Sequence, residues 1–366
     1  MTAESAAPER TTDALVTRLF EGGLAMFDLM SVYVGDRLGL YRDLHDRGPA
    51  TSAELASRAG IAERYAREWL EQQAVTGLLD VDDVTAGASS RRYALPEAYA
   101  PALIDPDSPS SIAPVGRSIV ACAKALPDVL EAFRTGGGVD WAAYGDDMIE
   151  AQGDFNRPWI RARLGTEILP ALAEVDARLR ADPPARVADV ACGVGWAGIA
   201  IAAAYPTVRV DGFDLDLSSI DLANANAREA GVADRVSFAV RDAADPAAAG
   251  RYDLAVVVEA IHDLSHPVAV LSAIRSMLAP GGVALIFDEK AEEAFTAPGS
   301  ELERLYYGYS VFTCLPAAMT EPDSAGTGTV MREGTFRDYA EAAGFGRLDR
   351  LDEPELDTLR LYRLTP

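Results

Sequence analysis

Residues 187–198 read VADVACGVGWAG, a short apolar run that leads into a glycine-rich turn. The pattern predicts a strand ending at Asp189, a tight turn, and a helix that starts near Gly195. Gly193 and Gly195 lack a Cβ and tolerate positive φ, so the backbone can approach a ligand closely. The first turn of the helix would face that ligand. The stretch therefore predicts a ligand-binding α/β domain.

From residue 186 onward, short apolar runs alternate with helical segments. This alternation is typical of a doubly wound parallel sheet with helices on both faces. We expect strands at residues 186–190, 208–213, 235–240, 252–258 and 283–287. Residues 288–331 are too long for a plain connector, so we expect a lid or substrate-binding insert there. A last helix is predicted at residues 334–343.

The glycine spacing alone leaves two ligands open. Gly193, Gly195 and Gly198 fit the G-x-G-x-x-G pattern of a dinucleotide site. However, a carboxylate at Asp189 would repel a pyrophosphate and suits a ligand that carries an ammonium group. Asp214, at the end of the second predicted strand, can accept from both hydroxyls of a ribose.

Three elements together resemble the class I S-adenosylmethionine-dependent methyltransferases: DVACGVG at 189–195, FDLD at 213–216 and RDA at 241–243. The resemblance covers residues 186–363 and implies a Rossmann-like α/β domain with a seven-stranded sheet. It implies S-adenosyl-L-methionine as cofactor, S-adenosyl-L-homocysteine as product, and no metal. The residues expected at the cofactor are Asp189, Gly193, Gly195, Asp214, Leu215, Asp242, Ala243 and Glu259. An NAD-type fold and a relative that no longer binds the cofactor are the alternatives.

The residues after the fourth predicted strand, 259–267, read EAIHDLSHP and hold two of the three histidines of the chain. A side chain just beyond the carboxyl end of a parallel strand faces the ligand crevice, and a histidine there can act as a general base. The string HDLS resembles the HDWS stretch of small-molecule O-methyltransferases. That resemblance implies that His262 takes the proton of a hydroxyl as the methyl group is transferred. The alternative for His262 is a hydrogen-bonded cap of the strand–helix turn.

Nearby carboxylates complete the predicted catalytic group. Asp263 and Glu289 are the other catalytic candidates. Either Asp288 or Glu289, after the fifth strand, could orient the histidine, and Glu259 could orient it or contact the cofactor. A solvated carboxylate at a strand end is the alternative for each.

Residues 14–110 are predicted to form a winged-helix domain, preceded by a disordered tail at residues 1–13. Thr51 and Glu54 match a capping box, Gly60 ends that helix, and a second helix follows at about residues 63–76. Its expected buried residues are Tyr65, Trp69, Leu70 and Val75. Two short strands at 78–81 and 92–95 would form the wing. Helical regions are expected before it at 14–31 and 31–46, and Gly22 and Gly23 weaken one continuous helix.

The charges of this domain argue against DNA binding. Residues 51–95 hold five arginines against seven acids. The pairs Glu63–Arg67, Arg64–Glu68 and Arg67–Glu71 have the i, i+4 spacing of a self-neutralising helix face, whereas a recognition helix keeps its cations for phosphates. The chain resembles actinobacterial proteins that join a winged helix to a methyltransferase domain. The small-molecule O-methyltransferase resemblance implies a homodimer built by the N-terminal domain.

Residues 111–182 are expected to form a helical connector that precedes the methyltransferase domain at 183–366. The connector is expected to contribute to the acceptor site. Polar side chains amid aromatic ones fit the edge of a pocket for a small-molecule methyl acceptor. The expected substrate-binding residues are Trp141, Tyr144, Gln152, Asn156 and Arg157, with Tyr309 from the insert. Core and dimer packing is the alternative for each.

The composition limits the classes of protein to which the chain can belong. The 366 residues carry a net charge of −24, which excludes a general binder of phosphate backbones. Three scattered cysteines make neither a disulfide framework nor a metal motif. No apolar run reaches the roughly 18 residues of a membrane span, and the tail has no signal-peptide core, so a cytoplasmic location is expected. A cofactor-sensing transcriptional regulator and a methyltransferase-like enzyme with another reaction are the rival functions.

Overall fold

The computed structural model describes residues 10–245, 250–352 and 355–366. Its internal contacts divide the chain into two units, Met1–Val120 and Ala121–Pro366. Residues 1–9 of the predicted tail lie outside the described residues, whereas Thr12 and Asp13 open the first helix. The boundaries predicted at residues 110 and 182 are finer than this division and stay predictions.

The first unit has the predicted helix-turn-helix and wing. The hydroxyl of Thr51 accepts from the N–H of Glu54 while the Glu54 carboxylate accepts from the N–H of Thr51, which confirms the capping box. Gly60 ends that helix with a φ of +68°. The two wing strands pair antiparallel. The elements are α1 (Thr12–Arg37), α2 (Leu40–Arg47), α3 (Ser52–Ala59), α4 (Glu63–Val75), β1 (Asp80–Val81), β2 (Tyr93–Ala94), η1 (Glu97–Tyr99) and α5 (Ala100–Leu103).

Two sequence predictions for this unit were wrong. Helix α1 runs unbroken through Gly22 and Gly23, since a glycine in a helix interior costs only about 1 kcal/mol against alanine. In α4, Trp69 and Leu70 are buried as predicted, but Tyr65 and Val75 are 77% and 86% exposed. The buried positions of α4 follow one helical stripe, Ala66, Trp69, Leu70 and Gln73, and neither Tyr65 nor Val75 lies on it.

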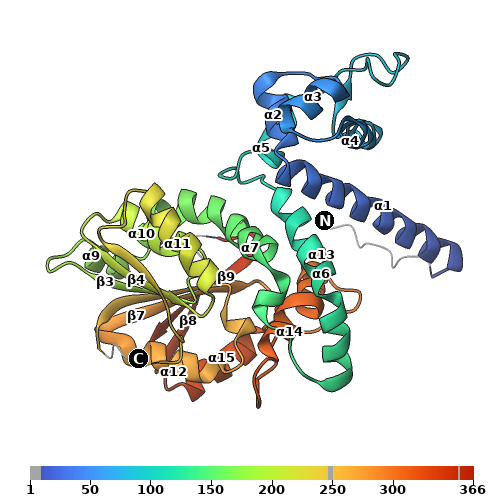
Figure 1. Ribbon diagram of the computed structural model, residues 1–366. Helices are drawn as coiled ribbons and strands as arrows, with labels where there is room; N and C mark the ends of the chain where they lie inside the picture. The colour runs from blue at the N-terminus through green and yellow to red at the C-terminus, as the bar shows by residue number, and fades with distance from the viewer. Residues whose placement is uncertain (1–9, 246–249, 353–354) are drawn as a thin grey trace, which may run out of the picture. The chain divides into compact units, whose positions relative to one another are not determined.

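The second unit is built on a seven-stranded sheet (Figure 1). The strand order is β5-β4-β3-β6-β7-β9-β8, and the first five strands in this order are parallel. Strands β9 and β8 close the sheet as an antiparallel pair beside β7. The strands are β3 (Arg186–Val190), β4 (Arg209–Asp214), β5 (Val236–Val240), β6 (Tyr252–Val258), β7 (Leu278–Glu289), β8 (Arg347–Leu351) and β9 (Leu359–Thr365). All five predicted strands are present, and β3 and β6 have the predicted bounds.

Alternating residues of β3, β4, β6 and β7 face two hydrophobic cores, whereas the edge strand β5 buries one face only. Val187 and Leu254 face one cluster, which contains side chains of η3, α10 and α11. Ala188 and Ala255, one residue further along, face the other cluster, which contains side chains of α12 and α15. This period of two explains why the strands read as continuous apolar runs. The parallel strands therefore end at one shared edge, where the residues after β3, β4, β6 and β7 gather.

Helices cover both faces of this sheet, as Figure 1 shows. The helical elements of this part of the chain are α6 (Ala113–Thr135), which spans the division between the units, η2 (Trp141–Tyr144), α7 (Asp146–Trp159), η3 (Ile160–Ile168), α8 (Leu169–Ala171), α9 (Ala173–Leu179), α10 (Trp196–Ala204), α11 (Leu217–Glu229), η4 (Ile261–Asp263), α12 (Pro267–Met277) and α15 (Glu333–Ala342). Residues 146–179 form one nearly continuous helical region, with η3 in π geometry.

The predicted insert contains three short helices, α13 (Glu301–Tyr309), η5 (Ser310–Cys314) and α14 (Leu315–Ala318). Its end is attached to the loop after β6. The N–H of Ala325 donates to the carbonyl of Ser265 at 2.9 Å, and the N–H of Gly328 donates to the carbonyl of His262 at 3.0 Å. The insert therefore packs directly on the segment that carries the catalytic candidate.

Within the described residues, none of the helices is both long enough and apolar enough to cross a membrane.

The glycine-rich turn gives a stability prediction. At Gly195 the backbone has a φ of +85°, and a Cβ would come within 2.6 Å of the Phe238 ring. Gly195→Ala should therefore destabilise the second unit by about 2–4 kcal/mol in denaturant melts. Gly22→Ala is the control, because a Cβ there meets nothing within 4 Å and alanine favours the helix by about 0.5–1 kcal/mol. Equal effects of the two substitutions would contradict this account.

Candidate active site

The turn after β3 has the geometry that its glycines require. Gly193 and Gly195 have φ values of +49° and +85°, and a Cβ at Gly193 would meet nothing within 4 Å. The N–H of Cys192 donates to the carbonyl of Phe213, which ties the turn to β4. The backbone at Gly193 is therefore open on the side where a side chain would project.

Two predicted cofactor residues brace this turn. Asp189 is buried, and its Oδ2 accepts from the N–H of Gly198 at 2.8 Å, in the first turn of α10. Asp214 accepts from the N–H of Gly193 at 2.9 Å and from the N–H of Asp216 at 3.0 Å. Burial raises the pKa of Asp189 to about 7 and also raises the pKa of Asp214. The loop thus holds two carboxyl groups that resist ionisation.

The other residues predicted to contact the cofactor follow the next strands. Leu215 is 64% exposed directly after β4. Asp242 is exposed after β5, and its Oδ1 accepts from the N–H of Ala244 at 2.8 Å, while Ala243 is buried. These three residues lie at the same sheet edge as Asp214, because β4 and β5 are parallel neighbours.

The structure brings Glu259 together with two predicted substrate residues. Its Oε2 accepts from Nε2 of Gln152 at 2.6 Å and from Nδ2 of Asn156 at 3.0 Å. Glu259 has a φ of +50°, a left-handed conformation that is costly for a residue with a side chain and that often marks a functional site. Burial raises the pKa of Glu259. Helix α7 is therefore connected to the loop after β6 through one carboxyl group.

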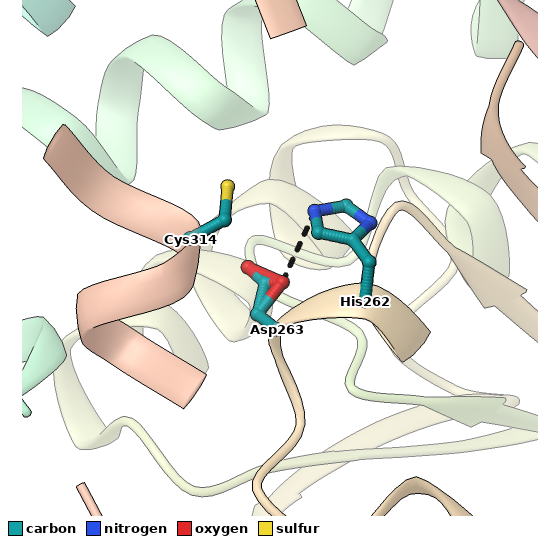
Figure 2. Close-up of side chains that lie close together, drawn as sticks. All are labelled: His262, Asp263 and Cys314. Carbon is teal, nitrogen blue, oxygen red and sulfur yellow. Dashed lines mark ion pairs between the residues drawn. The ribbon is translucent and has the colours of Figure 1, made fainter. Parts of the chain in front are cut away.

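His262 lies at the centre of a cluster of carboxylates. Its side chain is buried, and Nδ1 is 2.9 Å from Oδ1 of Asp288 and 2.8 Å from Oε2 of Glu289. On the other side of the ring, Nε2 is 3.1 Å from Oδ1 of Asp263, the pair joined by the dashed line in Figure 2. Both acids at the end of the fifth strand, Asp288 and Glu289, therefore contact the histidine, and their role in orienting it stays a prediction.

The protonation of this cluster follows from burial and charge. Burial lowers the pKa of His262, but Glu289, Asp263 and Asp288 outweigh it and hold that pKa well above its usual value. Burial raises the pKa of Glu289 well above normal, with a further rise from Asp288. Burial also raises the pKa of Asp288, yet His262 brings it below its usual value. The three neighbouring carboxyl groups therefore favour the protonated form of His262, whose Nδ1 forms a hydrogen bond with Asp288 at 2.9 Å.

Cys314 is the residue that the sequence analysis missed. Its Sγ lies within 4.8 Å of a ring nitrogen of His262 and of a carboxylate oxygen of Asp263, as Figure 2 shows. Burial raises its pKa to about 11, so it is a neutral thiol at neutral pH. A lone cysteine in a long insert carries no signal in the sequence, and only the packing of η5 on the loop after β6 reveals it.

One of the contacts around His262 is a hydrogen bond. Nδ1 lies 2.9 Å from Oδ1 of Asp288 with hydrogen-bond geometry. The nearest oxygens of Asp263 and Glu289 lie 3.1 and 2.8 Å from the ring nitrogens and have no hydrogen-bond partner among the described residues. The cluster is therefore a set of buried ion pairs that includes one hydrogen bond.

The remaining predicted substrate residues have partners of their own. Tyr144 is fully buried, and its hydroxyl donates to the carbonyl of Phe312 at 2.8 Å, which joins η2 to the insert. Trp141 packs beside it. The guanidinium of Arg157 lies 4.8 Å from the centre of the Trp196 ring, and Tyr309 is half-buried at the end of α13. Their roles toward a substrate stay predictions.

Comparison with known families matches both parts of the chain. Residues 187–282 match the model of a methyltransferase domain, and residues 25–104 match that of an Rv2258c-like winged helix-turn-helix domain. An uncharacterized protein of Synechococcus is 32% identical over 103 residues. That match spans 28% of this chain and only 25% of the relative.

Solved structures share the fold over almost the whole chain. Human N-acetylserotonin methyltransferase, in complex with S-adenosylmethionine, has a TM-score of 0.67 at 18% identity and covers 100% of this chain and 99% of its own. An O-methyltransferase family protein from Burkholderia thailandensis has a TM-score of 0.67 at 17% identity, with 98% of each chain covered. The neocarzinostatin O-methyltransferase NcsB1, in complex with S-adenosylhomocysteine and 1,4-dihydroxy-2-naphthoic acid, has a TM-score of 0.54 at 21% identity and covers 92% and 95%.

Asp189 gives a prediction about pH. Its pKa is about 7 in the folded protein but near 4 in an unfolded chain, so the unfolded state ionises first. Asp189 therefore lowers the free energy of unfolding, and this loss grows as the pH rises from about 4 to about 7. Asp189→Asn should raise the melting temperature above that of the natural protein by a larger amount at pH 8 than at pH 5. The two increases should differ by on the order of 5 °C. Asp221→Asn, at an exposed position of α11, should show no such change, and equal shifts at both pH values for Asp189→Asn would contradict the assignment.

The matched domain models, the strand order and the glycine-rich turn after β3 all indicate the same fold. The chain joins an N-terminal segment that matches a winged helix-turn-helix domain to a segment that matches a methyltransferase domain, and its second unit has the class I methyltransferase fold.

Proposed function

We propose that this protein transfers a methyl group from S-adenosylmethionine to a hydroxyl oxygen of a small molecule, with His262 as the general base. The observation that carries the proposal is the position of His262. It is buried at the carboxyl end of β6, with carboxylates on both ring nitrogens, at the sheet edge that also holds the glycine-rich turn. A histidine held in this way can take a proton in a site that excludes water.

The residues at this edge suit the cofactor chemically. The backbone at Gly193 is open to a ligand, and the carboxyl groups of Asp189, Asp214 and Glu259 suit a molecule with positive charge and ribose hydroxyls. When bound, S-adenosylmethionine supplies a methyl group already activated on a positively charged sulfur. The protein then has to align the acceptor, exclude water and receive a proton.

We assign roles to the residues around that cofactor. Asp214 would accept from the ribose hydroxyls, because each oxygen of its carboxylate has a lone pair left after binding one backbone N–H. Leu215, Asp242 and Ala243, which follow β4 and β5, would contact the adenine. Glu259 would lie near the cationic end, where Gln152 and Asn156 already hold it.

The two sides of the His262 ring would have different tasks. Asp288 and Glu289 contact Nδ1, and a carboxylate there fixes the ring orientation and stabilises the imidazolium that forms. Nε2 faces Asp263 and the Cys314 thiol of the insert. We therefore assign Nε2 as the atom that receives the acceptor proton, and η5 as part of the acceptor side.

The acceptor side favours a small aromatic hydroxyl compound. Trp141, Gln152, Asn156 and Arg157 lie on η2 and α7, and Tyr309 lies in the insert that packs on the loop after β6. Human N-acetylserotonin methyltransferase is named for a hydroxylated aromatic molecule, and the NcsB1 structure holds 1,4-dihydroxy-2-naphthoic acid. An aromatic acceptor with one placed hydroxyl would fit these side chains.

The charges of the winged helix support a structural task for that domain. All five arginines of residues 51–95 pair with acids inside the first unit, through Arg58–Asp43, Arg64–Glu68, Arg67–Glu63, Arg91–Glu71 and Arg92–Glu54. The pairing predicted between Arg67 and Glu71 was wrong, because Glu71 pairs with the wing residue Arg91. A domain whose arginines are engaged in this way has few cations to offer to DNA phosphates.

Helix α1 supports a homodimer as the working form. Its apolar residues Val16, Phe20, Leu24 and Phe27 recur along one stripe, and all four are exposed. A stripe of this size on a soluble helix marks an interaction surface. We propose a second copy of this chain as its partner, so that the stripes of two α1 helices bury each other.

Replacement of His262 tests the catalytic proposal. Phenols, acids and thiols would be screened with a labelled methyl donor, and His262→Asn should lower kcat at least about a hundredfold with any acceptor found. The affinity for S-adenosylhomocysteine should change only a few-fold. His266→Asn is the control, because His266 is partly exposed and pairs with Glu321. Near-normal turnover of a folded His262→Asn protein would remove His262 as the base, and product mixtures without S-adenosylhomocysteine would indicate another reaction.

Charge placed on the α1 stripe tests the dimer. Phe20→Glu with Phe27→Glu should convert a dimer into a folded monomer in sedimentation velocity, because two copies would then bring four carboxylates together in an apolar interface. Arg18→Glu, on the other face of α1, should leave the dimer intact. A monomeric natural protein, or a dimer unaffected by the double substitution, would contradict the proposal.

A further inference from the structure

His262 is surrounded by ionisable groups from every element packed around it. Asp263 is its neighbour in η4, and Asp288 and Glu289 come from the end of β7. Glu259 acts on it from the loop after β6, and Cys314 contacts it from η5. Tyr306 of α13 acts on Glu289 and Glu259, and is neutral because burial raises its pKa.

The carboxyl groups around His262 also interact electrostatically with Asp214, beside the glycine-rich turn, and through it with Asp189. Asp263 is influenced by both Glu259 and Asp214, and Asp214 in turn acts on Asp189. Six carboxyl groups are therefore linked: Asp189, Asp214, Glu259, Asp263, Asp288 and Glu289. Among the charged groups that act most strongly on them in the described part of the chain, His262 is the only cation. The cluster is built to hold a positive charge.

This arrangement conflicts with a simple base mechanism. A general base must be neutral before it can accept a proton. In the protein without ligands, however, the carboxylates favour the imidazolium form of His262. Some event before catalysis has to remove that proton, and the unit of linked carboxyl groups identifies the event as the arrival of another positive charge.

We propose that His262 exchanges its proton for the positive charge of the cofactor, so that the imidazolium of the free protein becomes a neutral base when a sulfonium occupies the same carboxylate cluster. The inference rests on the proposed function, because it takes S-adenosylmethionine as the ligand. Two cations close together repel each other, and the carboxylates that stabilised the proton then stabilise the sulfonium. S-adenosylhomocysteine has a neutral sulfur and leaves the proton in place.

The exchange keeps the charge of the site constant through the reaction. During transfer the acceptor oxygen gains the methyl group, the carbon–sulfur bond breaks, and its electron pair stays on the sulfur. His262 takes the proton of the acceptor hydroxyl at the same time. The carboxylates therefore lose one positive charge at the sulfur and gain one at the imidazole, so that they stabilise the products as well as the reactants.

Proton linkage makes the exchange measurable. At pH values between the pKa of His262 in the complex and its raised pKa in the free protein, close to one proton leaves for each S-adenosylmethionine bound, so the affinity should rise by up to about tenfold per pH unit in that range. The affinity for S-adenosylhomocysteine should stay nearly constant over the same range. The preference for the cofactor over its product should therefore grow with pH.

The histidine content of the chain allows a direct experiment. Only His45, His262 and His266 are present, so ¹⁵N-histidine labelling gives three imidazole signals, and His262→Asn identifies the one from His262. Each imidazole would be titrated by NMR in the full-length protein alone, with S-adenosylhomocysteine, and with S-adenosylmethionine without an acceptor. Calorimetry in buffers of different ionisation enthalpy would count the protons released.

We expect the pKa of His262 to fall by at least about two units with S-adenosylmethionine only, with release of close to one proton at intermediate pH that disappears in His262→Asn. His45 and His266 serve as internal controls and should not change. Binding of both ligands with an unchanged His262 signal would overturn the inference alone, as would proton release that persists in His262→Asn, since the proton would then come from a carboxyl group. Failure of both ligands to bind would overturn the proposed cofactor and this inference together.

Discussion

The ion pairs between His262 and the carboxylates at the ends of β6 and β7 are the constraint on which the rest of the site depends. A buried imidazolium is stable only if carboxylates compensate for the lost hydration, and buried carboxylates need the cation equally. Asp288 and Glu289 contact one side of the ring and Asp263 the other. Removal of His262 would leave three buried carboxyl groups without their cation, and removal of one carboxyl group would weaken the field that stabilises the imidazolium.

The sheet is what makes that assembly possible. Parallel strands end at one edge, so residues after β3, β4, β6 and β7 meet although up to 100 positions separate them in the chain, as between Asp189 and Glu289. The alternating burial of β3, β4, β6 and β7 anchors both faces of these strands in separate cores, which fixes the positions of their ends. The insert then covers the loop of His262 through backbone hydrogen bonds. The sheet thus carries a site made of strand ends, the segments that follow them, and side chains of α7 and η5.

Local patterns predicted much of this architecture. The apolar runs located β3 and β6 to the residue, and the capping box located α3, because both depend on neighbours in the sequence. The position of Cys314 and the bond between Glu259 and α7 depend on how distant segments pack, which no local pattern encodes. Tyr65 was misplaced for the same reason, since its side of α4 is decided by the neighbouring helices. The raised pKa of His262 could be predicted only after three carboxylates were known to face it.

Calorimetric titration with S-adenosylhomocysteine tests the central claim, that the glycine-rich turn and the carboxyl groups at the strand ends form a cofactor site. The account predicts micromolar binding to the natural protein, and binding at least about tenfold weaker for Asp214→Ala, which removes the acceptor of the ribose hydroxyls. Absence of binding to the natural protein, or the same affinity in both, would contradict the assignment of this site.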